Sequence, residues 1–164
     1  MKSAQTIRVH FICTGNIYRS RLTEAYLRSK NLPHVTVSSS GTMANTQYKG
    51  PIVWTALRLL YRNNLLQYMS DKWTQTTSDQ LDKADIVVFI GKNNFEYCQQ
   101  RFPIPKNYEV WDLPDFDDRD MNGKPLDMNR ESECITLSEN VYAMVKEKVD
   151  RLVITYKLDS GSKQ

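Results

Sequence analysis

The chain has 164 residues, of which 40% are apolar and 25% are charged, a balance typical of one globular domain with a single core. Its formal net charge is only +3, and the basic residues do not gather into a stripe, so we expect neither a nucleic-acid nor a membrane surface. The chain has no apolar run long enough to span a bilayer and opens without the apolar segment of a signal peptide, so a cytoplasmic location is expected.

Cysteine and histidine usage argues against two further classes of protein. The three cysteines, Cys13, Cys98 and Cys134, are an odd number and lie far apart, which disfavours a disulfide framework and suits a reducing compartment. With two histidines and no Cys-x-x-Cys pair, a zinc site is not expected. We expect Cys98 and Cys134 to be inert small apolar side chains, and His10 to be a residue of the core or of a sheet face whose hydrogen bonds are satisfied.

The first predicted elements are a strand and a helix joined by a short polar loop. The sequence IRVHFI at 7–12 is rich in β-forming residues and predicts a strand covered on both faces, with Cys13 at its carboxyl end. Beyond Ser20 the apolar residues recur at three- and four-residue steps, so the loop at 14–19 should open directly into a helix. Backbone N–H groups at a helix N-terminus lack intrahelical partners, and the aligned peptide dipoles add positive potential. The loop therefore predicts an oxyanion site.

The residue types in this loop indicate phosphoryl chemistry. Cys13 is the predicted nucleophile, because a helix N-terminus and a neighbouring guanidinium favour the thiolate. Arg19 supplies the guanidinium, whose planar fork matches two phosphoryl oxygens. Gly15 lets the backbone approach the anion, Asn16 is expected in a left-handed conformation, and Ser20 is expected to donate to the Cys13 sulfur. The predicted substrate-binding residues are Thr14, Gly15, Asn16, Ile17, Tyr18 and Ser20. The alternative is a buried structural cysteine at the end of a strand.

The rest of the chain alternates between strands and helices. The predicted elements are a strand at 34–38, a helix beginning at Pro51, a short helix with a capping box of Thr77 and Gln80, a buried strand at 85–91, a helix at 93–101, a strand at 108–113 and a last helix capped by Thr136 and Glu139. This alternation implies a parallel sheet covered on both faces, which binds ligands at the carboxyl ends of its strands. We expect residues 1–158 to form a single domain and 159–164 to be a frayed tail.

The loop and its surroundings carry a family resemblance. CTGNIYRS at 13–20, followed by LTEA at 22–25, resembles the active-site signature of the low-molecular-weight protein tyrosine phosphatases, Cys-x-Gly-Asn-x-x-Arg-Ser before a helix. SSGT at 39–42 resembles the family's Ser-Ala-Gly-Thr, and Asn94 ends a segment that resembles its Met-Asp-x-x-Asn, with Ile and Gly replacing Met and Asp. The resemblance covers most of the chain. It implies an α/β fold, a three-layer sandwich with a four-stranded parallel sheet of order 2-1-3-4 flanked by helices.

The sequence departs from the family pattern at three further places. Tyr18 stands where the family usually has a second cysteine, and the family's His-x-x-Arg segment before the third strand has no convincing counterpart at 69–72. In the loop after the fourth predicted strand, the resemblance implies Asp115 as the general acid, which a phenolate or alkoxide leaving group requires. Positions 116–118 carry Phe for the usual Pro and two Asp for two Tyr. Asp112 is the alternative acid, and a solvated acidic loop without a catalytic role is the other interpretation.

The same acidic loop contains half of a calcium motif. Asp118, Asp120, Asn122 and Gly123 match the first half of an EF-hand loop, whose early positions offer oxygen ligands and whose sixth residue makes the turn. The twelfth position, which requires a bidentate Glu, is Asn129. A calcium site is therefore disfavoured, and no metal is expected.

Together, the residues and the resemblance predict a phosphomonoester hydrolase, specifically a protein tyrosine phosphatase with a phosphocysteine intermediate. Cys13 would attack phosphorus while the loop amides and Arg19 hold the oxygens, and Asp115 would first protonate the leaving group and then activate water, so no cofactor is required. Expected substrates are phosphotyrosine proteins or small aryl phosphates, and a monomer is expected. One alternative is an arsenate reductase on the same fold. Such an enzyme needs resolving cysteines for a disulfide relay, and Cys98 alone near the third predicted strand does not readily provide them. The other alternative is a non-catalytic phosphate- or phosphoprotein-binding module.

Overall fold

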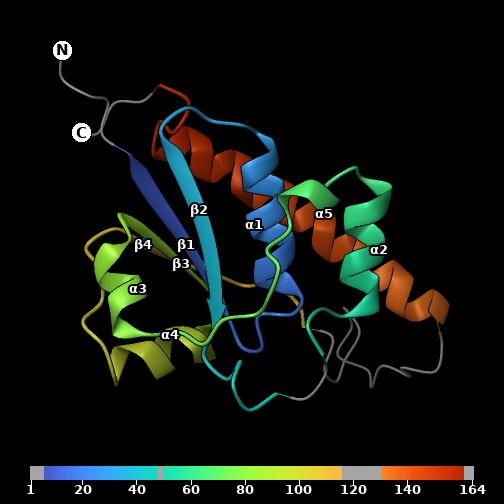
Figure 1. The fold of residues 1–164 in the computed structure, drawn as a ribbon, viewed down its shortest axis with the longest axis horizontal. Coiled ribbons are helices and arrows are strands. Elements are labelled where there is room, and N and C mark those ends of the chain that lie inside the picture. The colour runs from blue at the N-terminus through green and yellow to red at the C-terminus, as the bar shows by residue number, and fades with distance from the viewer. Residues whose placement is uncertain (1–5, 48–49, 116–130, 161–164) are drawn as a thin grey trace.

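The computed structural model describes residues 6–47, 50–115 and 131–160, and within them a four-stranded parallel sheet forms the centre of the molecule (Figure 1). The strands are β1 (Ile7–Cys13), β2 (Val35–Gly41), β3 (Ile86–Ile90) and β4 (Tyr108–Trp111), in the spatial order β2-β1-β3-β4. Helices α1 (Arg19–Ser29), α2 (Trp54–Arg62) and α5 (Glu131–Thr155) lie on one side of the sheet, and α3 (Ser78–Lys83) and α4 (Lys92–Gln99) lie on the other. A 3-10 turn, η1 (Leu66–Tyr68), follows α2. The predicted three-layer α/β fold and its strand order are confirmed.

The sheet separates two apolar clusters, because successive side chains of a strand point to opposite faces. Val9 and Phe11 of β1 belong to the larger cluster, which includes residues of α1, α2 and α5. Ile12 belongs to the smaller cluster, together with Phe89 of β3 and Cys98 of α4. All five residues of β3 are apolar and buried, as expected for a central strand that is covered on both faces.

The second helix begins later than predicted. Pro51 does not start it, because α2 begins at Trp54 and Val53 occupies the N-cap with an extended backbone. The Val53 N–H donates to the Ile17 carbonyl at 3.0 Å, which ties this residue to the loop after β1 instead of to a helical turn from Pro51. The predicted capping box at the start of α3 is present and is confirmed.

The last helix begins earlier than predicted. Helix α5 starts at Glu131, so the predicted cap of Thr136 and Glu139 is wrong. Thr136 instead lies within the helix, where its hydroxyl donates to the Ser132 carbonyl at 2.9 Å. A threonine satisfied by the preceding turn does not interrupt a helix, and the fully buried Cys134 extends the apolar face upstream of the predicted start.

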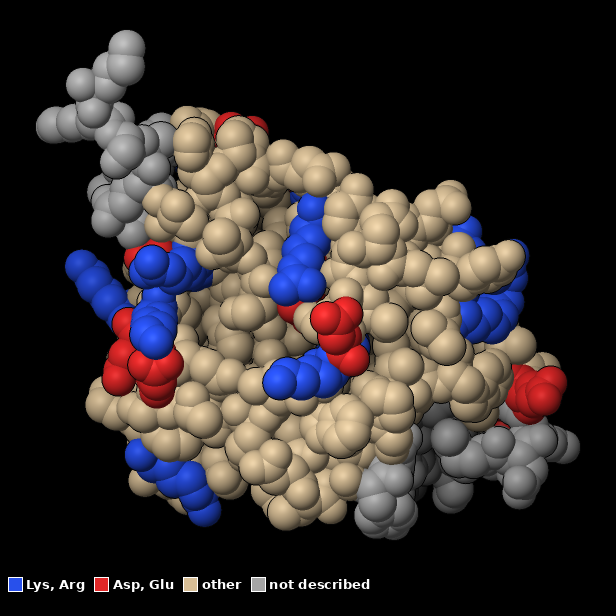
Figure 2. Space-filling view, in the orientation of Figure 1, with Lys and Arg blue, Asp and Glu red and all other residues tan. Residues whose placement is uncertain are grey.

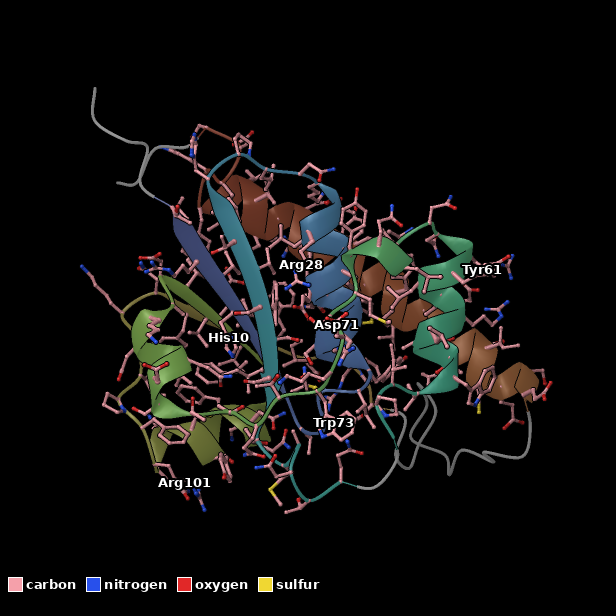
Figure 3. The ribbon with its side chains drawn as sticks, in the orientation of Figure 1. His10, Arg28, Tyr61, Asp71, Trp73 and Arg101 are labelled. Atoms are coloured by element: carbon pink, nitrogen blue, oxygen red, sulfur yellow. The ribbon has the colours of Figure 1, made fainter. Side chains whose placement is uncertain are left out.

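His10 is buried between two hydroxyls of the neighbouring strand (Figure 3). Its Nδ1 lies 2.7 Å from Ser38 Oγ, and its Nε2 lies 2.8 Å from Ser40 Oγ. Burial lowers the pKa of His10 from 6.5 to about 4, so the ring is neutral at neutral pH. The interpretation of His10 as a satisfied core residue is confirmed.

Acid is expected to destabilise the protein through this buried ring. Between pH 6.5 and about 4 the unfolded chain binds a proton that the folded His10 excludes, so the stabilisation is fully present above pH 6.5 and is lost as the pH falls towards 4. We expect this group to remove roughly 2 kcal/mol of unfolding free energy between pH 7 and pH 5. Urea unfolding at the two pH values should show a smaller pH dependence in His10→Gln than in the unsubstituted protein.

The exposed second histidine provides the control for this measurement. His34 is exposed and has a φ of +66°, a conformation that asparagine adopts readily, so His34→Asn removes a histidine without disturbing the core. An identical pH dependence in His10→Gln and the unsubstituted protein would contradict the assignment.

Charges of both signs are interspersed on the face that shows α1 and β2. Figure 2 shows Lys and Arg side chains beside Asp and Glu side chains on this face, without a large patch of one sign. This face therefore offers no single-sign field for a polyanion. Elsewhere along the chain, surface ion pairs such as Lys83 with Asp79 and Arg58 with Glu139 also join charges of opposite sign. Within the described ranges, no helix is both long and apolar enough to cross a membrane.

Candidate active site

The loop 14–18 lies between the end of β1 and the start of α1, as predicted. Cys13 is the last residue of β1, and Arg19 is the first residue of α1. Gly41 ends β2 in register beside Cys13, and the Thr42 N–H donates to the Cys13 carbonyl at 2.9 Å. Strand β2 therefore extends three residues beyond its predicted end and packs its last residues against the loop.

Gly41 permits this close packing. A Cβ atom at this position would lie 2.5 Å from the Thr14 carbonyl oxygen, 2.7 Å from the Asn16 nitrogen and 2.8 Å from the Gly15 carbonyl carbon. All three are backbone atoms, so the loop itself would have to move. At Gly15, by contrast, a Cβ atom would meet the Ile17 side chain at 3.4 Å, close to an ordinary contact.

The Cys13 sulfur lies in a hydrogen-bond network. Ser20 Oγ is 2.9 Å from it, and the Asn16 N–H donates to it at 3.3 Å. Asn16 has the predicted left-handed conformation, with a φ of +55°. Its Nδ2 donates to Ser20 Oγ at 2.8 Å and to Ser39 Oγ at 2.9 Å, while its Oδ1 accepts from the Thr74 N–H at 2.8 Å. The Asn16 side chain thus ties the loop to α1, to β2 and to the segment before α3.

Arg19 and Asp115 are in contact, although they come from distant parts of the chain. The Arg19 guanidinium forms an ion pair with Asp115 and also donates to the Leu113 carbonyl at 3.3 Å and to Thr14 Oγ1 at 3.5 Å. Parallel sheets bring such residues together, because the carboxyl ends of β1 and β4 lie at one edge. Asp112 is exposed and does not line the cavity next to Cys13. The geometry therefore places Asp115, rather than Asp112, at the candidate site.

A cavity of about 140 Å³ opens over the loop. Its walls are Cys13, Thr14, Gly15, Ile17, Tyr18, Arg19, Met43, Thr46, Gln47, Val53 and Asp115. Burial and the nearby Asp115 carboxylate raise the pKa of Tyr18, so its phenol stays protonated. A larger cavity of about 320 Å³, next to Ile7 and Asp85, lies at the opposite edge of the sheet, away from the strand ends where parallel sheets bind ligands.

The walls differ in part from the predicted set of substrate-binding residues. Asn16 and Ser20 do not line the cavity, and at 1% and 0% exposure they lie beneath the loop and hold it from behind. Four residues that line the cavity were not predicted, namely Met43, Thr46, Gln47 and Val53. No local pattern marks them, because Met43 is placed by the end of β2 and Val53 by its hydrogen bond to the loop.

Asn94, which resembles a family position, braces the other side of the loop. Its Oδ1 accepts from Thr42 Oγ1 at 2.7 Å, its Nδ2 donates to the Ile90 carbonyl at 2.7 Å, and Thr14 Oγ1 lies 3.3 Å away. Gly91 precedes α4 with a φ of +100°, a conformation that favours glycine. The glycine that replaces the family's Asp thus supports the turn that presents Asn94.

The segment 69–72 also braces the loop, which the sequence did not predict. The Ser70 carbonyl accepts from Arg21 at 2.5 Å, and Ser70 Oγ donates to Glu24 at 2.6 Å. Arg21 and Glu24, both 1% exposed, come from α1, and Arg21 also donates to the Asn16 carbonyl at 3.5 Å. A helical sequence pattern does not reveal such buried charges, because their partners lie far away along the chain.

The described residues provide no candidate metal site. Within residues 6–47, 50–115 and 131–160, no group of three or more His, Cys, Asp or Glu side chains could hold a metal ion. The departures at 116–118 and the calcium alternative at 118–129 lie outside the described residues. All three cysteines are buried thiols, and burial raises the pKa of Cys98 to about 11.

Known proteins resemble the chain over most of its length. A family model described as low molecular weight phosphotyrosine protein phosphatase matches residues 8–161. A protein-arginine-phosphatase from Geobacillus stearothermophilus is 27% identical over 100 residues, which cover 61% of this chain and 65% of that relative, less than two thirds of its length.

Two solved structures share the fold at low sequence identity. The low molecular weight protein tyrosine phosphatase of Streptococcus pyogenes has a TM-score of 0.67 and 15% identity, covering 92% of this chain and 93% of that chain. A thioredoxin-dependent arsenate reductase of Corynebacterium glutamicum has a TM-score of 0.58 and 19% identity, covering 93% of this chain and 65% of that chain. Since the family model spans nearly the whole chain, the protein belongs to the low molecular weight phosphotyrosine protein phosphatase family.

Proposed function

We propose that this protein hydrolyses aryl phosphate monoesters, including phosphotyrosine in proteins, through a phosphocysteine intermediate. The observation that carries the proposal is the convergence of Cys13, Arg19 and Asp115 on one cavity over a helix N-terminus. These groups supply a nucleophile, an anion-binding fork and a proton donor, which are the three functions that the reaction requires. Since all three cysteines are thiols, we also propose a location in the reducing cytoplasm.

In the first step the Cys13 thiolate attacks phosphorus, so that an S–P bond forms as the P–O bond breaks. The loop N–H groups and the Arg19 guanidinium hold the three remaining oxygens. Protonated Asp115 gives its proton to the departing phenolate oxygen. Because Arg19 contacts Asp115 in the structure, a phosphoryl group entering the cavity competes with this carboxylate for the guanidinium.

In the second step Asp115 accepts a proton from a water molecule that attacks phosphorus. The S–P bond breaks, inorganic phosphate forms, and the electron pair returns to the Cys13 sulfur. Ser20 Oγ at 2.9 Å and the Asn16 N–H at 3.3 Å lie next to this sulfur, so they are positioned to stabilise the leaving thiolate. The cycle regenerates the Cys13 thiolate and protonated Asp115 and consumes one water molecule, and it requires no cofactor.

The walls of the cavity favour an aryl group over phosphoarginine. Ile17, Met43 and Val53 provide apolar surface on which an aromatic ring packs. The polar guanidinium of phosphoarginine gains less than an aromatic ring from burial against these side chains. Phosphoarginine is the second candidate substrate, because the Geobacillus stearothermophilus relative is named a protein-arginine-phosphatase.

Turnover of p-nitrophenyl phosphate tests the hydrolase, and two peptides test its specificity. We expect a higher kcat/KM for a phosphotyrosine peptide than for a phosphoarginine peptide of the same flanking sequence. Faster release of phosphate from phosphoarginine would overturn the aryl assignment. No turnover of any of the three substrates would overturn the hydrolase and favour a phosphate-binding module.

Arsenate reduction is disfavoured by the state of the cysteines. A disulfide relay needs a second thiolate that can attack the first sulfur, and nucleophilic attack requires a sizeable thiolate fraction. Burial raises the pKa of Cys98 to about 11 and leaves its side chain fully covered. We therefore expect no arsenate-dependent oxidation of reduced thioredoxin by the purified protein.

Gly41→Ala is expected to impair the loop without altering any residue of the cavity. The added Cβ would lie within 2.5–2.8 Å of loop backbone, and displacement of a catalytic group by about 1 Å costs on the order of 10²-fold in rate. We expect kcat/KM for p-nitrophenyl phosphate to fall by about that factor, measured alongside thermal unfolding to show that the fold persists. Unchanged kcat/KM in a folded Gly41→Ala variant would contradict the steric explanation.

A further inference from the structure

Glu24 is a buried carboxylate whose three neighbours all donate to it. It lies on α1 with 1% exposure, and Ser39 Oγ and Ser70 Oγ donate to its two oxygens at 2.6 Å each. Arg28, which Figure 3 shows on the same helix, pairs with it at 2.7 Å. A carboxylate paired with a guanidinium only accepts hydrogen bonds. The Ser39 and Ser70 hydroxyls must therefore point their protons at Glu24.

The direction of the bond from Ser39 to Glu24 also determines the direction of the bond between Ser39 and Asn16. Because Ser39 has given its one proton to Glu24, it can only accept from Asn16 Nδ2, which lies 2.9 Å away. The orientation of the Asn16 amide is supported independently, since its Oδ1 accepts from the Thr74 N–H at 2.8 Å. The second Nδ2 proton is directed at Ser20 Oγ at 2.8 Å.

The chain of bonds ends at the nucleophile. Ser20 is fully buried and accepts from Asn16, and the Cys13 sulfur lies 2.9 Å from its oxygen. The geometry of this pair alone allows either atom to donate, but the upstream bonds leave the Ser20 proton to point at sulfur. With the Asn16 N–H at 3.3 Å, two donors then face Cys13, and donors directed at the charged form favour that form.

We propose that Glu24 is a positioning residue that orients the bonds of Ser39, Asn16 and Ser20 so that the Ser20 hydroxyl donates to the Cys13 thiolate. The inference rests on the proposed function, because it concerns the nucleophile of that reaction. Glu24 does not line the cavity, so the list of cavity residues alone would not identify this role.

Substitution of Glu24 by Gln reverses the direction of one bond. Arg28 and Ser70 both donate to Oε1, so the new amide must turn its oxygen towards them and its NH₂ group towards Ser39. Ser39 then receives two donors and loses the acceptor for its own proton. The Asn16 amide, which Thr74 still holds at its oxygen, then loses its fixed acceptor at Ser39. The bond from Asn16 to Ser20 that directs the Ser20 proton at sulfur is therefore weakened.

A through-space effect of the Glu24 charge would act in the opposite direction. The groups that face Cys13 or the network are Arg19 and Arg21 of α1, Asp115 after β4, the protonated Tyr18, and Arg28 and Asp71 beside Arg21 and Glu24. Removing a negative charge from this set would favour the thiolate, because like charges disfavour each other. The two explanations therefore predict shifts of opposite sign.

The pH midpoint of Cys13 alkylation by iodoacetamide, followed by mass spectrometry of the peptide that contains Cys13, tests the proposal. We expect Glu24→Gln and Ser39→Ala each to raise this midpoint by about one pH unit, and the double variant to raise it no further than either single variant. Glu139→Gln, the same change at a half-exposed ion pair with Arg58, should leave the midpoint unchanged.

An unchanged or lowered midpoint in Glu24→Gln would overturn the proposal. If that variant does not fold, Ser39→Ala decides, because it retains the Glu24 charge and interrupts the chain of bonds. Alkylation requires no substrate, so the result stands even if the unsubstituted protein fails to hydrolyse p-nitrophenyl phosphate. Conversely, an active enzyme with unshifted midpoints overturns the role of Glu24 alone.

Discussion

The Cys13→Ser variant is expected to hydrolyse p-nitrophenyl phosphate at no more than the background rate while still binding inorganic phosphate. A serine hydroxyl is not ionised at neutral pH and is a far weaker nucleophile than a thiolate, and loss of a nucleophile lowers kcat by roughly 10⁴-fold or more. The loop N–H groups and Arg19 that form the anion site remain. Steady-state kinetics and calorimetric titration with phosphate measure the two effects separately.

Two further variants serve as comparisons for Cys13→Ser, one in the anion site and one at a different cysteine. Arg19→Lys should lose both turnover and phosphate affinity, because an ammonium group cannot reproduce the planar fork of a guanidinium. Cys98→Ala, which removes a fully buried thiol in the smaller apolar cluster, should retain turnover. More than trace hydrolysis by purified Cys13→Ser would show that another group is the nucleophile.

Asp115→Asn is expected to depress hydrolysis of phosphotyrosine far more than hydrolysis of p-nitrophenyl phosphate. Loss of a general acid affects poor leaving groups most, and such groups commonly contribute ~10²–10⁴-fold. Asp112→Asn, an equal chemical change at an exposed position three residues away, is the matched control. Equal losses on both substrates, or a larger leaving-group dependence in Asp112→Asn, would assign the role elsewhere.

The same substitution should strengthen the binding of inorganic phosphate. The Asp115 carboxylate pairs with Arg19 in the structure, and a neutral amide competes less strongly for the guanidinium. A variant that is slower on phosphotyrosine and also binds phosphate more tightly has lost an acid and gained an accessible anion site. General unfolding would weaken both properties together, so calorimetric titration with phosphate distinguishes the two explanations.

The helices illustrate how far local patterns extend. The capping box before α3 is a contact between residues three positions apart, and it was predicted from sequence alone and confirmed. The starts of α2 and α5 were predicted wrongly, because Pro51 and Thr136 each fit a helix start locally. Contacts outside the local pattern decide these positions, namely the hydrogen bond from Val53 to Ile17 and the burial of Cys134.

The order of the strands came from the family resemblance and not from periodicity. Alternation of strands and helices implies a parallel sheet, but many strand orders satisfy that pattern. The observed order β2-β1-β3-β4 depends on pairings between segments such as β1 and β3. The paired residues lie more than seventy positions apart along the chain, so no local stretch of sequence predicts which strands pair.

The sequence by itself determined the strand, the loop and the helix from Ile7 to Ser29. The apolar periodicity of the strand and the helix and the left-handed preference of Asn16 are properties of residues that are close together in the chain. Only the tertiary structure decided which distant groups meet there. Arg19 contacts Asp115 across 96 positions, and Glu24 accepts from Ser70 across 46. A parallel sheet brings the carboxyl ends of its strands to one edge regardless of their separation along the chain, and a local pattern cannot encode that meeting.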